Sequence, residues 1–506
     1  MTRVISVNPA TGVERELSIE ETTPAEVNAL ADRAASVALA YADQPLTWRS
    51  NFLHAMADEL ESHSAALVEI ANDETALGTP RLEGELRRTA FQLRFFADVV
   101  LDGSFLAVSV DHAKDSPMGP LPDLRRLRVP VGPVAVFGSS NFPFAFSVPG
   151  GDTASALAAG CPVVIKAHPA HPATSLAAFE ALRSAAEKLN APEGVLALVF
   201  GFDAGVALVD APSIRAVGFT GSVPAGRSLW NRANARAVPI PFYGELGSAN
   251  PLVVTPAAAA ERAAQIGAGA AGSMTLGVGQ FCTKPGLLFV PQDDHGDELV
   301  AAMVDSLNQL SPMTMLSDSI ADHFRLGTIT IDGVDGNNHL VGDDSSEGAE
   351  VSAQLFEVPA RVFADPSSQA LRDERFGPLA VIVRYRDDAD LKTALAATDP
   401  ALTFSIFTST SDPRAAWLFD FAQTKAGRVI ANGYPTGVGV SWSMQHGGPW
   451  PATTSAASTS VGAGSIDRWL RPVTYQNVPD DLLPEALRES NPLKLPRRVD
   501  GSPVSQ

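Results

Sequence analysis

The chain has little cysteine, little positive charge and no long apolar run. Cys161 and Cys282 are its two cysteines, too few for a disulfide framework or a cysteine-rich zinc site, so we expect a reducing, cytoplasmic setting. No segment approaches the roughly 20 apolar residues that span a bilayer, and the first residues lack the apolar centre of a signal peptide. With 37 Lys+Arg against 57 Asp+Glu, we expect neither nucleic acid nor an anionic membrane as a partner.

The remaining composition is that of a folded globular protein, 45% hydrophobic and 19% charged. Its 506 residues exceed what one hydrophobic core usually organises, so two or three structural units are expected. Apolar residues recur at helical spacing between 25 and 42, and we expect further helices over 46–72 and 81–100. Prolines interrupt a weakly alternating stretch at 105–128, which predicts an extended arm outside the main sheet.

From Val131 onward, short apolar runs alternate with alanine-rich helical stretches. This rhythm predicts βαβ units and a parallel sheet covered by helices on both faces. A comparable series resumes after the first, so we expect two α/β blocks that meet near 246–252. The acidic, glycine-rich segment 332–350 is most simply a surface loop.

Polar residues that follow the apolar runs are the first candidates for function, because a parallel sheet binds ligands beyond the carboxyl ends of its strands. Each also has a plainer explanation. Asn141 can stabilise a turn or donate to an oxyanion, and Lys166 can end a strand in solvent or reach a nucleotide. Ser222 can simply cap a helix, or open a helix N-terminus to a pyrophosphate. The turn with Gly201 and Gly205 can border the same crevice.

Two further strand ends carry a carboxylate and a thiol. Glu245 lies between glycines, either as a surface carboxylate or as one that can swing toward a site. Cys282, in "GQFCTKPG", is either core filling or a nucleophile. Cys161 precedes a buried run and is interpreted as a small core residue.

These residues sit in motifs that occur in order along the chain: Asn141-Phe-Pro, Lys166, "GFTGS" (218–222), "GELGSANP" (244–251), "GQFCTKPG" (279–286) and "ERFGP" (374–378). Together they resemble the aldehyde dehydrogenase superfamily over nearly the whole chain. The resemblance implies an α/β fold with a Rossmann-like cofactor domain, an α/β catalytic domain and a small β oligomerisation arm. It also implies that a cysteine attacks an aldehyde, passes through a thiohemiacetal and a thioester, and releases a carboxylic acid.

In that resemblance Cys282 is the nucleophile, Asn141 and the Cys282 backbone N–H stabilise the oxyanion, and Glu245 activates water. An ordinary thiol is only about 3% ionised at pH 7, so Cys282 needs an environment that favours the thiolate. The residues implied in binding NAD or NADP are Lys166, His168, Pro169, Gly201, Gly205, Phe219, Gly221, Ser222, Leu246, Glu374 and Phe376. No metal is expected.

Two departures from the family pattern point to cofactor and substrate. Many members carry a glutamate three residues after the lysine, where this chain has Pro169. Removing that carboxylate removes a group that repels the 2′-phosphate of NADP, so NADP is expected to be accepted and preferred. Ser140 replaces a usual tryptophan, and with "QHGGPWPAT" (445–453) it resembles the branch of α-ketoglutaric semialdehyde dehydrogenases and NADP-preferring fatty aldehyde dehydrogenases.

Within that branch, we expect α-ketoglutaric semialdehyde to be oxidised to 2-oxoglutarate. The alternative is a fatty or other aliphatic aldehyde. Arg88 is the candidate that binds the distal carboxylate of the semialdehyde, and Phe142 is also expected at the substrate site. An equal alternative is that Arg88 lies on the surface and pairs with Glu83 or Glu85. A CoA-acylating dehydrogenase and a non-catalytic structural relative are weaker readings, since Glu245 and Cys282 are both present.

The expected organisation divides the chain as follows. Residues 1–104 and 129–246 form the dinucleotide-binding domain and 247–433 the catalytic domain. Residues 105–128 and 467–477 are oligomerisation elements, 434–466 a substrate and anchor loop region, and 478–506 a C-terminal tail. The partners expected are a small aldehyde and further copies of the chain, as a homodimer or homotetramer.

Overall fold

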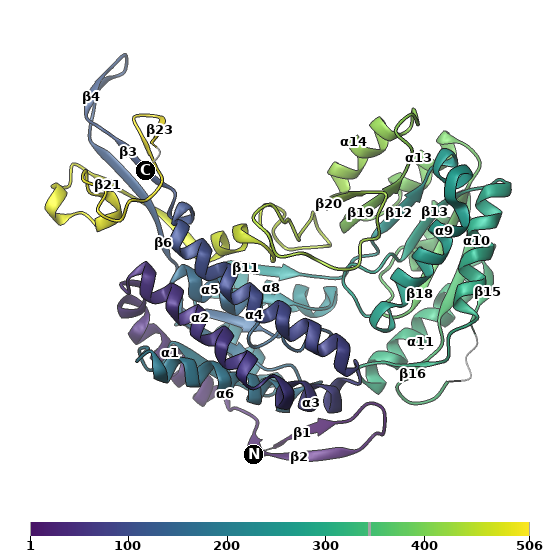
Figure 1. Cartoon of the computed structure of the whole chain (residues 1–506), viewed down its shortest axis with the longest axis horizontal. Coiled ribbons are helices and arrows are strands. Elements are labelled where there is room, and N and C mark those ends of the chain that lie inside the picture. The colour runs from purple at the N-terminus through teal and green to yellow at the C-terminus, as the bar shows by residue number, and fades with distance from the viewer. Residues whose placement is uncertain (1, 343–345, 505–506) are drawn as a thin grey trace.

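The computed structural model describes residues 2–342 and 346–504. Figure 1 shows two α/β bodies side by side and a β arm that projects from the first. Within the described residues, no helix combines the length and the apolar character needed to cross a bilayer.

The chain begins with a hairpin and four helices. A capping box between Thr23 and Glu26 starts the first helix. The sequence predicted one helix over 46–72, but the structure breaks it at His63, whose backbone leaves helical geometry while its Nδ1 contacts the Glu59 carbonyl at 2.8 Å. The elements are β1 (Arg3–Val7), β2 (Glu14–Glu20), α1 (Pro24–Ala42), α2 (Leu46–Ser62), α3 (Ser64–Thr75) and α4 (Thr79–Asp102).

The first α/β body contains a five-stranded sheet in the order β11-β10-β7-β8-β9, parallel throughout. Alternate residues of its strands enter two different cores: Val134 and Val136 pack with α2, α4, α5 and α6, whereas Ala135 and Phe137 pack with α1, α7 and α8. The elements are β7 (Val134–Phe137), α5 (Gly151–Ala159), β8 (Val163–Lys166), α6 (Pro172–Lys188), β9 (Leu196–Val199), α7 (Phe202–Asp210), β10 (Ala216–Thr220), α8 (Val223–Ala235) and β11 (Phe242–Glu245).

The second body contains a seven-stranded sheet in the order β15-β17-β18-β13-β12-β19-β20, parallel except for β15. Its central strands are buried on both faces, as a helix-covered parallel sheet requires. The elements are β12 (Pro251–Val254), α9 (Pro256–Thr275), β13 (Leu287–Pro291), α10 (Asp294–Leu307), β14 (Met313–Thr314), α11 (Asp318–Asp332), β15 (Asn338–Val341), β16 (Glu350–Val351), β17 (Gln354–Pro359), α12 (Ala360–Phe363), β18 (Leu379–Tyr385), α13 (Asp388–Ala396), β19 (Ala401–Phe407), α14 (Ala415–Lys425) and β20 (Ala426–Ala431).

The arm is a separate sheet in the order β21-β6-β3-β22-β23. Its longest pairing joins β6 to β21 antiparallel, which brings the Pro-rich segment and the late strand together. The C-terminal segment adds its own strand beside β3 instead of only covering the surface. A small hairpin extends from the arm, with Met118 93% exposed at its turn (Figure 1). The elements are β3 (Val108–Asp111), β4 (Lys114–Ser116), β5 (Gly119–Leu121), β6 (Leu124–Pro130), β21 (Leu470–Gln476), β22 (Arg497–Val499) and β23 (Ser502–Val504).

The segment between β20 and β21 connects the second body back to the first. It passes over the carboxyl end of β11, where the Leu246 N–H donates to the Ala452 carbonyl and Glu245 forms a β-bridge with Thr453. Residues more than 200 positions apart in the chain are therefore adjacent at the end of the first sheet.

Candidate functional site

Cys282 lies in the turn that leads into β13, held from behind by a buried amide. The Asn250 side chain donates to the Cys282 carbonyl at 2.8 Å and to the Lys284 carbonyl at 3.0 Å. Cys282 is partly exposed as a residue, and its Sγ lies 3.5 Å from Nε2 of His446. The sulfur is thus held beside an imidazole.

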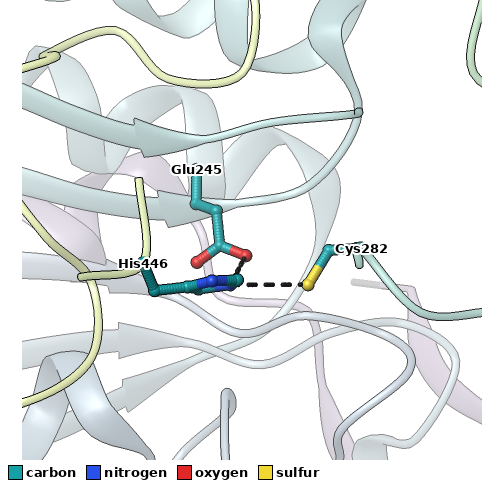
Figure 2. Close-up of side chains that lie close together, drawn as sticks. All are labelled: Glu245, Cys282 and His446. Carbon is teal, nitrogen blue, oxygen red and sulfur yellow. Dashed lines mark hydrogen bonds and ion pairs between the residues drawn. The ribbon is translucent and has the colours of Figure 1, made fainter. Parts of the chain in front are cut away.

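Glu245 is the last residue of β11 and is 3% exposed. One carboxylate oxygen lies 2.8 Å from His446 Nε2, and the other accepts a hydrogen bond of 2.5 Å from the Ser460 hydroxyl. Figure 2 shows Glu245, His446 and Cys282 converging, with dashed lines from the His446 ring to each of the other two. The carboxylate is therefore held by the segment that crosses the sheet end.

The charges of these groups depend on one another. Burial pushes the pKa of Glu245 upward, but His446, Ser460 and Cys282 together outweigh burial and leave that pKa below its ordinary value. Burial and the neighbouring Glu245 carboxylate raise the pKa of the Cys282 thiol well above its ordinary value. The site as it stands holds a carboxylate and a protonated thiol, so the thiol needs a proton acceptor before it can react.

Asn141 follows β7 and contacts the same turn. Its Nδ2 donates to the Gln280 carbonyl at 2.8 Å, two residues before Cys282. Arg81 donates to the Asn141 carbonyl at 2.6 Å and stacks on Phe142 and Phe281. The structure thus brings Asn141, Glu245 and Cys282 to one place from three different strand ends.

His446 and Ser460 were not identified from the sequence. The "QHGGPWPAT" stretch contributes only to the family resemblance, and Ser460 lies outside the motifs that carry it. Both residues belong to a segment without strand or helix periodicity, so no strand end marked them. A histidine in a glycine-rich stretch was the available signal.

The residues expected around a dinucleotide follow β8, β9 and β10. Lys166 ends β8, and burial lowers its pKa to about 8, which leaves it mainly cationic at neutral pH. Gly205 packs closely on this strand end, since a Cβ there would lie 3.2 Å from the Phe137 ring and 3.5 Å from Lys166 Cε. Gly201 adopts φ +101°, and a Cβ there would lie 3.0 Å from Cβ of Glu21.

His168 and Pro169 lie just beyond Lys166. His168 Nδ1 accepts from the Ala170 N–H at 3.1 Å, and burial puts the pKa of His168 well below its ordinary value. His168 is therefore neutral at pH 7 and adds no positive charge, whereas Pro169 is exposed. Of the cations expected here, Lys166 is the one that stays charged.

Glycines at the N-terminus of α8 allow close packing around this helix end. Ser222 caps the helix by accepting from the Ala225 N–H. A Cβ on Gly221 would lie 2.8 Å from the Phe219 ring, and a Cβ on Gly226 would lie 2.3 Å from Leu246 Cδ2. Both glycines are needed for Phe219 and Leu246 to pack against this helix end, whose free N–H groups suit a pyrophosphate.

Glu374 and Phe376 precede β18 on the second body. Glu374 lies against Gly247, where a Cβ would be 2.0 Å from its carboxylate oxygen. Burial raises the pKa of Glu374 to about 7, although the Ser248 N–H and the Lys284 ammonium favour the anion. Phe376 is half-buried two residues further on.

Arg88 is an interior residue of α4. One Nη donates to the Val438 carbonyl at 3.2 Å, and the guanidinium lies 5.2 Å from the centroid of the Phe146 ring. The surface pair with Glu83 is made by Arg87 instead. Nη1 of Arg88 is buried and lacks a hydrogen-bond partner in the part of the chain that the structure describes. Phe142 packs edge-on against Phe281 and against Phe146, the ring that Arg88 contacts.

Comparison with known proteins gives a consistent result. A family model described as "Aldehyde dehydrogenase family" matches residues 2–470. The chain is 48% identical over 469 residues to a protein of Azospirillum brasilense named alpha-ketoglutaric semialdehyde dehydrogenase 2, covering 91% of this chain and 89% of that protein. It is 40% identical over 480 residues to an alpha-ketoglutaric semialdehyde dehydrogenase of Acinetobacter baylyi, covering 94% and 91%.

Solved structures show the same architecture. Aldehyde dehydrogenase 21 of Physcomitrella patens, in complex with succinate, superposes with a TM-score of 0.80 at 21% identity, over 94% of this chain and 95% of that one. An NADP-dependent glyceraldehyde-3-phosphate dehydrogenase of Bacillus halodurans, complexed with NADP, superposes with a TM-score of 0.78 at 26% identity, over 94% and 95%.

Proposed function

This chain belongs to the aldehyde dehydrogenase family, and on that premise we propose that it oxidises α-ketoglutaric semialdehyde to 2-oxoglutarate, with Cys282 as the nucleophile. The observation that carries the assignment of Cys282 is its contact with the His446–Glu245 pair, at the meeting point of three strand ends. The two relatives named for this semialdehyde, at 48% and 40% identity, support the choice of substrate.

The Glu245 carboxylate is the proton acceptor for the thiol. It hydrogen-bonds the Cys282 thiol, and the Nε2–H of His446, 2.8 Å away, holds the carboxylate in place. The Sγ thiolate then attacks the aldehyde carbon. General base assistance of this kind contributes roughly 10²–10⁴-fold to rate.

Asn141 is assigned to the oxyanion that this attack creates. A side-chain amide has two N–H donors; one is used by the Gln280 carbonyl, and the second is available to the carbonyl oxygen of the substrate. Together with the Cys282 backbone N–H it forms an oxyanion hole. Loss of one such donor typically lowers kcat about 10²–10³-fold.

Members of the family use NAD or NADP. When bound, this dinucleotide would supply the hydride acceptor needed to oxidise the thiohemiacetal to a thioester. The capped N-terminus of α8, with Ser222 and its glycine neighbours, fits a pyrophosphate, and Lys166 and Glu374 fit the hydroxyls of the two riboses. Once the thiol proton has passed to solvent, Glu245 is anionic again and serves as the base that activates water to hydrolyse the thioester.

NADP is the preferred cofactor in this proposal. Pro169 puts no carboxylate at the position where a 2′-phosphate would lie, and Lys166 provides a cation. Glu21 is the negative charge that remains near Lys166, since its side chain lies against Gly201. It moderates the preference without abolishing it. Comparing kcat/KM for NADP and NAD tests this, and a tenfold or greater preference for NAD would contradict it.

Arg88 is assigned to the distal carboxylate of the semialdehyde. Its unpaired Nη1 is a buried donor that lacks an acceptor, and a substrate carboxylate would satisfy it. The Arg88 guanidinium interacts most with the charge of the buried Glu85, one of its expected partners, and also with those of Cys282 and Glu245. A second candidate, oxidation of neutral aliphatic aldehydes, would leave that donor unsatisfied.

One experiment separates the semialdehyde, aliphatic aldehyde and CoA-acylating activities. The semialdehyde and a fatty aldehyde are each offered with NADP, NAD or CoA, while NADPH or NADH absorbance and acid release are followed. We expect the semialdehyde to have the highest kcat/KM and the product to be the free acid. A higher kcat/KM for a fatty aldehyde would overturn the substrate, and acyl-CoA formation would overturn Glu245 as a hydrolytic base.

The projecting arm supports self-association of the chain, and the free thiols support a reducing location. The projecting hairpin, with its exposed Met118, offers a surface for pairing as a homodimer or homotetramer (Figure 1). Both cysteines are free thiols, which suits a reducing, cytoplasmic location. Light scattering of the purified protein measures the number of copies.

A further inference from the structure

The three side chains at the centre of the site also match the ligands of zinc. The Cys282 sulfur, a nitrogen of His446 and an oxygen of Glu245 all lie within 4.8 Å of one another (Figure 2). Thiolate, imidazole and carboxylate are the ligand types that Zn²⁺ takes in proteins. Hard cations such as Mg²⁺ and Ca²⁺ prefer oxygen ligands and do not suit this mixture.

The spacing of these atoms is close to that of a tetrahedral site. Bonds of about 2.3 Å to sulfur and about 2.05 Å to nitrogen, at a tetrahedral angle, put the two ligand atoms about 3.5 Å apart. Cys282 Sγ and His446 Nε2 are 3.5 Å apart already. Nε2 and the Glu245 oxygen are 2.8 Å apart and must open to about 3.3 Å. That is a small movement of one side chain.

The charges match as well. A thiolate and a carboxylate together carry two negative charges, which one Zn²⁺ neutralises in a buried place where repulsion between anions is costly. Cys282 is partly exposed while His446 and Glu245 are buried, so an ion would approach from the side of the sulfur. Three protein ligands leave the fourth position for water.

We propose that Cys282, His446 and Glu245 form an inhibitory Zn²⁺ site. Binding replaces the S–H bond of Cys282 with an S–Zn bond and releases the thiol proton to solvent; the Nε2 proton of His446 exchanges through solvent to Nδ1, and no electron is transferred. The sulfur lone pair that would attack an aldehyde is held in the S–Zn bond, and the Glu245 carboxylate is held as a ligand. Turnover therefore stops while Zn²⁺ is bound and returns when a chelator removes it. Only this inhibitory consequence rests on the proposed function.

The test uses Co²⁺ as a spectroscopic substitute and needs no turnover. The purified full chain, free of thiol reductants and chelators, is titrated with Co²⁺, and near-ultraviolet and visible spectra are recorded. We expect a thiolate-to-cobalt charge-transfer band and the intense visible bands of a four-coordinate site, both lost when Zn²⁺ is added. In parallel, Zn²⁺ should inhibit oxidation of any aldehyde that the enzyme accepts, and EDTA should restore the rate.

Two variants locate the ion. His446→Gln should weaken Zn²⁺ and Co²⁺ binding by at least about 10–100-fold, since losing even a residue that only supports a ligand costs that much. Cys161→Ser is the matched thiol control, because Cys161 is fully buried with its sulfur against the Trp469 carbonyl, and it should bind both metals like the wild type. Thermal unfolding of each variant checks that it is folded.

The proposal is overturned if no charge-transfer band appears, or if His446→Gln binds Zn²⁺ as tightly as the wild type. A loss of binding in Cys161→Ser would also overturn it. Failure of the substrate assignment gives a different result: the semialdehyde is not oxidised, yet the cobalt spectrum is unchanged.

Discussion

Replacing Glu245 with glutamine should change two reactions of Cys282 in opposite directions. The wild-type carboxylate lies within 4.8 Å of the sulfur, where two unit charges at an effective dielectric constant of about 20 repel each other by about 3.5 kcal/mol. Glutamine keeps the shape and removes that repulsion. The thiolate should then form more readily, and its reaction with iodoacetamide should accelerate at least about tenfold, which corresponds to about 1.4 kcal/mol.

Turnover should fall in the same variant. Glutamine cannot accept a proton from water, so hydrolysis of the thioester loses its base, and kcat should drop about 10²–10⁴-fold. Faster alkylation combined with slower turnover cannot result from a misfolded site, which would slow both.

The assay is the second-order alkylation rate of the cofactor-free enzyme between pH 6 and 10, with labelled peptides identified by mass spectrometry. Because Glu245 raises the pKa of the Cys282 thiol, the rate should rise with pH in both proteins, and the rise should come at lower pH in Glu245→Gln. A competing effect exists, since Glu245 also assists ionisation by accepting the thiol proton. If alkylation slows instead, that assistance outweighs the repulsion and the reasoning is wrong.

Three further substitutions test other parts of the site. His446→Ala should lower kcat by about 10–150-fold, because the charge-assisted hydrogen bond that positions the Glu245 carboxylate, worth about 1.5–3 kcal/mol, is lost. An unchanged kcat would contradict this positioning role. Arg88→Ala should raise KM for the semialdehyde by about tenfold or more and leave KM for a neutral aldehyde nearly unchanged, because a charge-assisted hydrogen bond of about 1.5–3 kcal/mol is lost. Arg87→Ala is the exposed control. Equal effects on both KM values would remove Arg88 from the substrate site. Glu21→Gln should raise the ratio of kcat/KM for NADP to kcat/KM for NAD several-fold, with Glu20→Gln as the control. An unchanged ratio would show that Glu21 does not act on the cofactor.

Much of the fold followed from periodicity in the sequence. The short apolar runs became the strands of two parallel sheets, since strands buried on both faces carry continuous apolar sequence. The break between α2 and α3 was not foreseen, because the apolar pattern continues through His63 and only its backbone departs from helical geometry. The pairing of β22 with β3 was equally hidden, because three-residue strands carry almost no pattern.

The site residues, too, were predicted only where they lie next to a regular strand or helix. Lys166, Ser222 and Glu245 were found because each ends a strand or starts a helix, and parallel strands place such ends together. His446 and Ser460 lie 201 and 215 positions from Glu245 in the chain. They reach it through an irregular segment, and long-range hydrogen bonds of that kind leave no local signature in a single sequence.

The central claim is that Cys282 carries the acyl group during turnover. The most direct measurement is mass spectrometry of Glu245→Gln quenched after reaction with the semialdehyde and NADP, where slow hydrolysis should let the thioester accumulate. We predict that the mass of the acyl group is added to the peptide containing Cys282. An unmodified Cys282 during active turnover, or full activity in Cys282→Ser, would contradict the account.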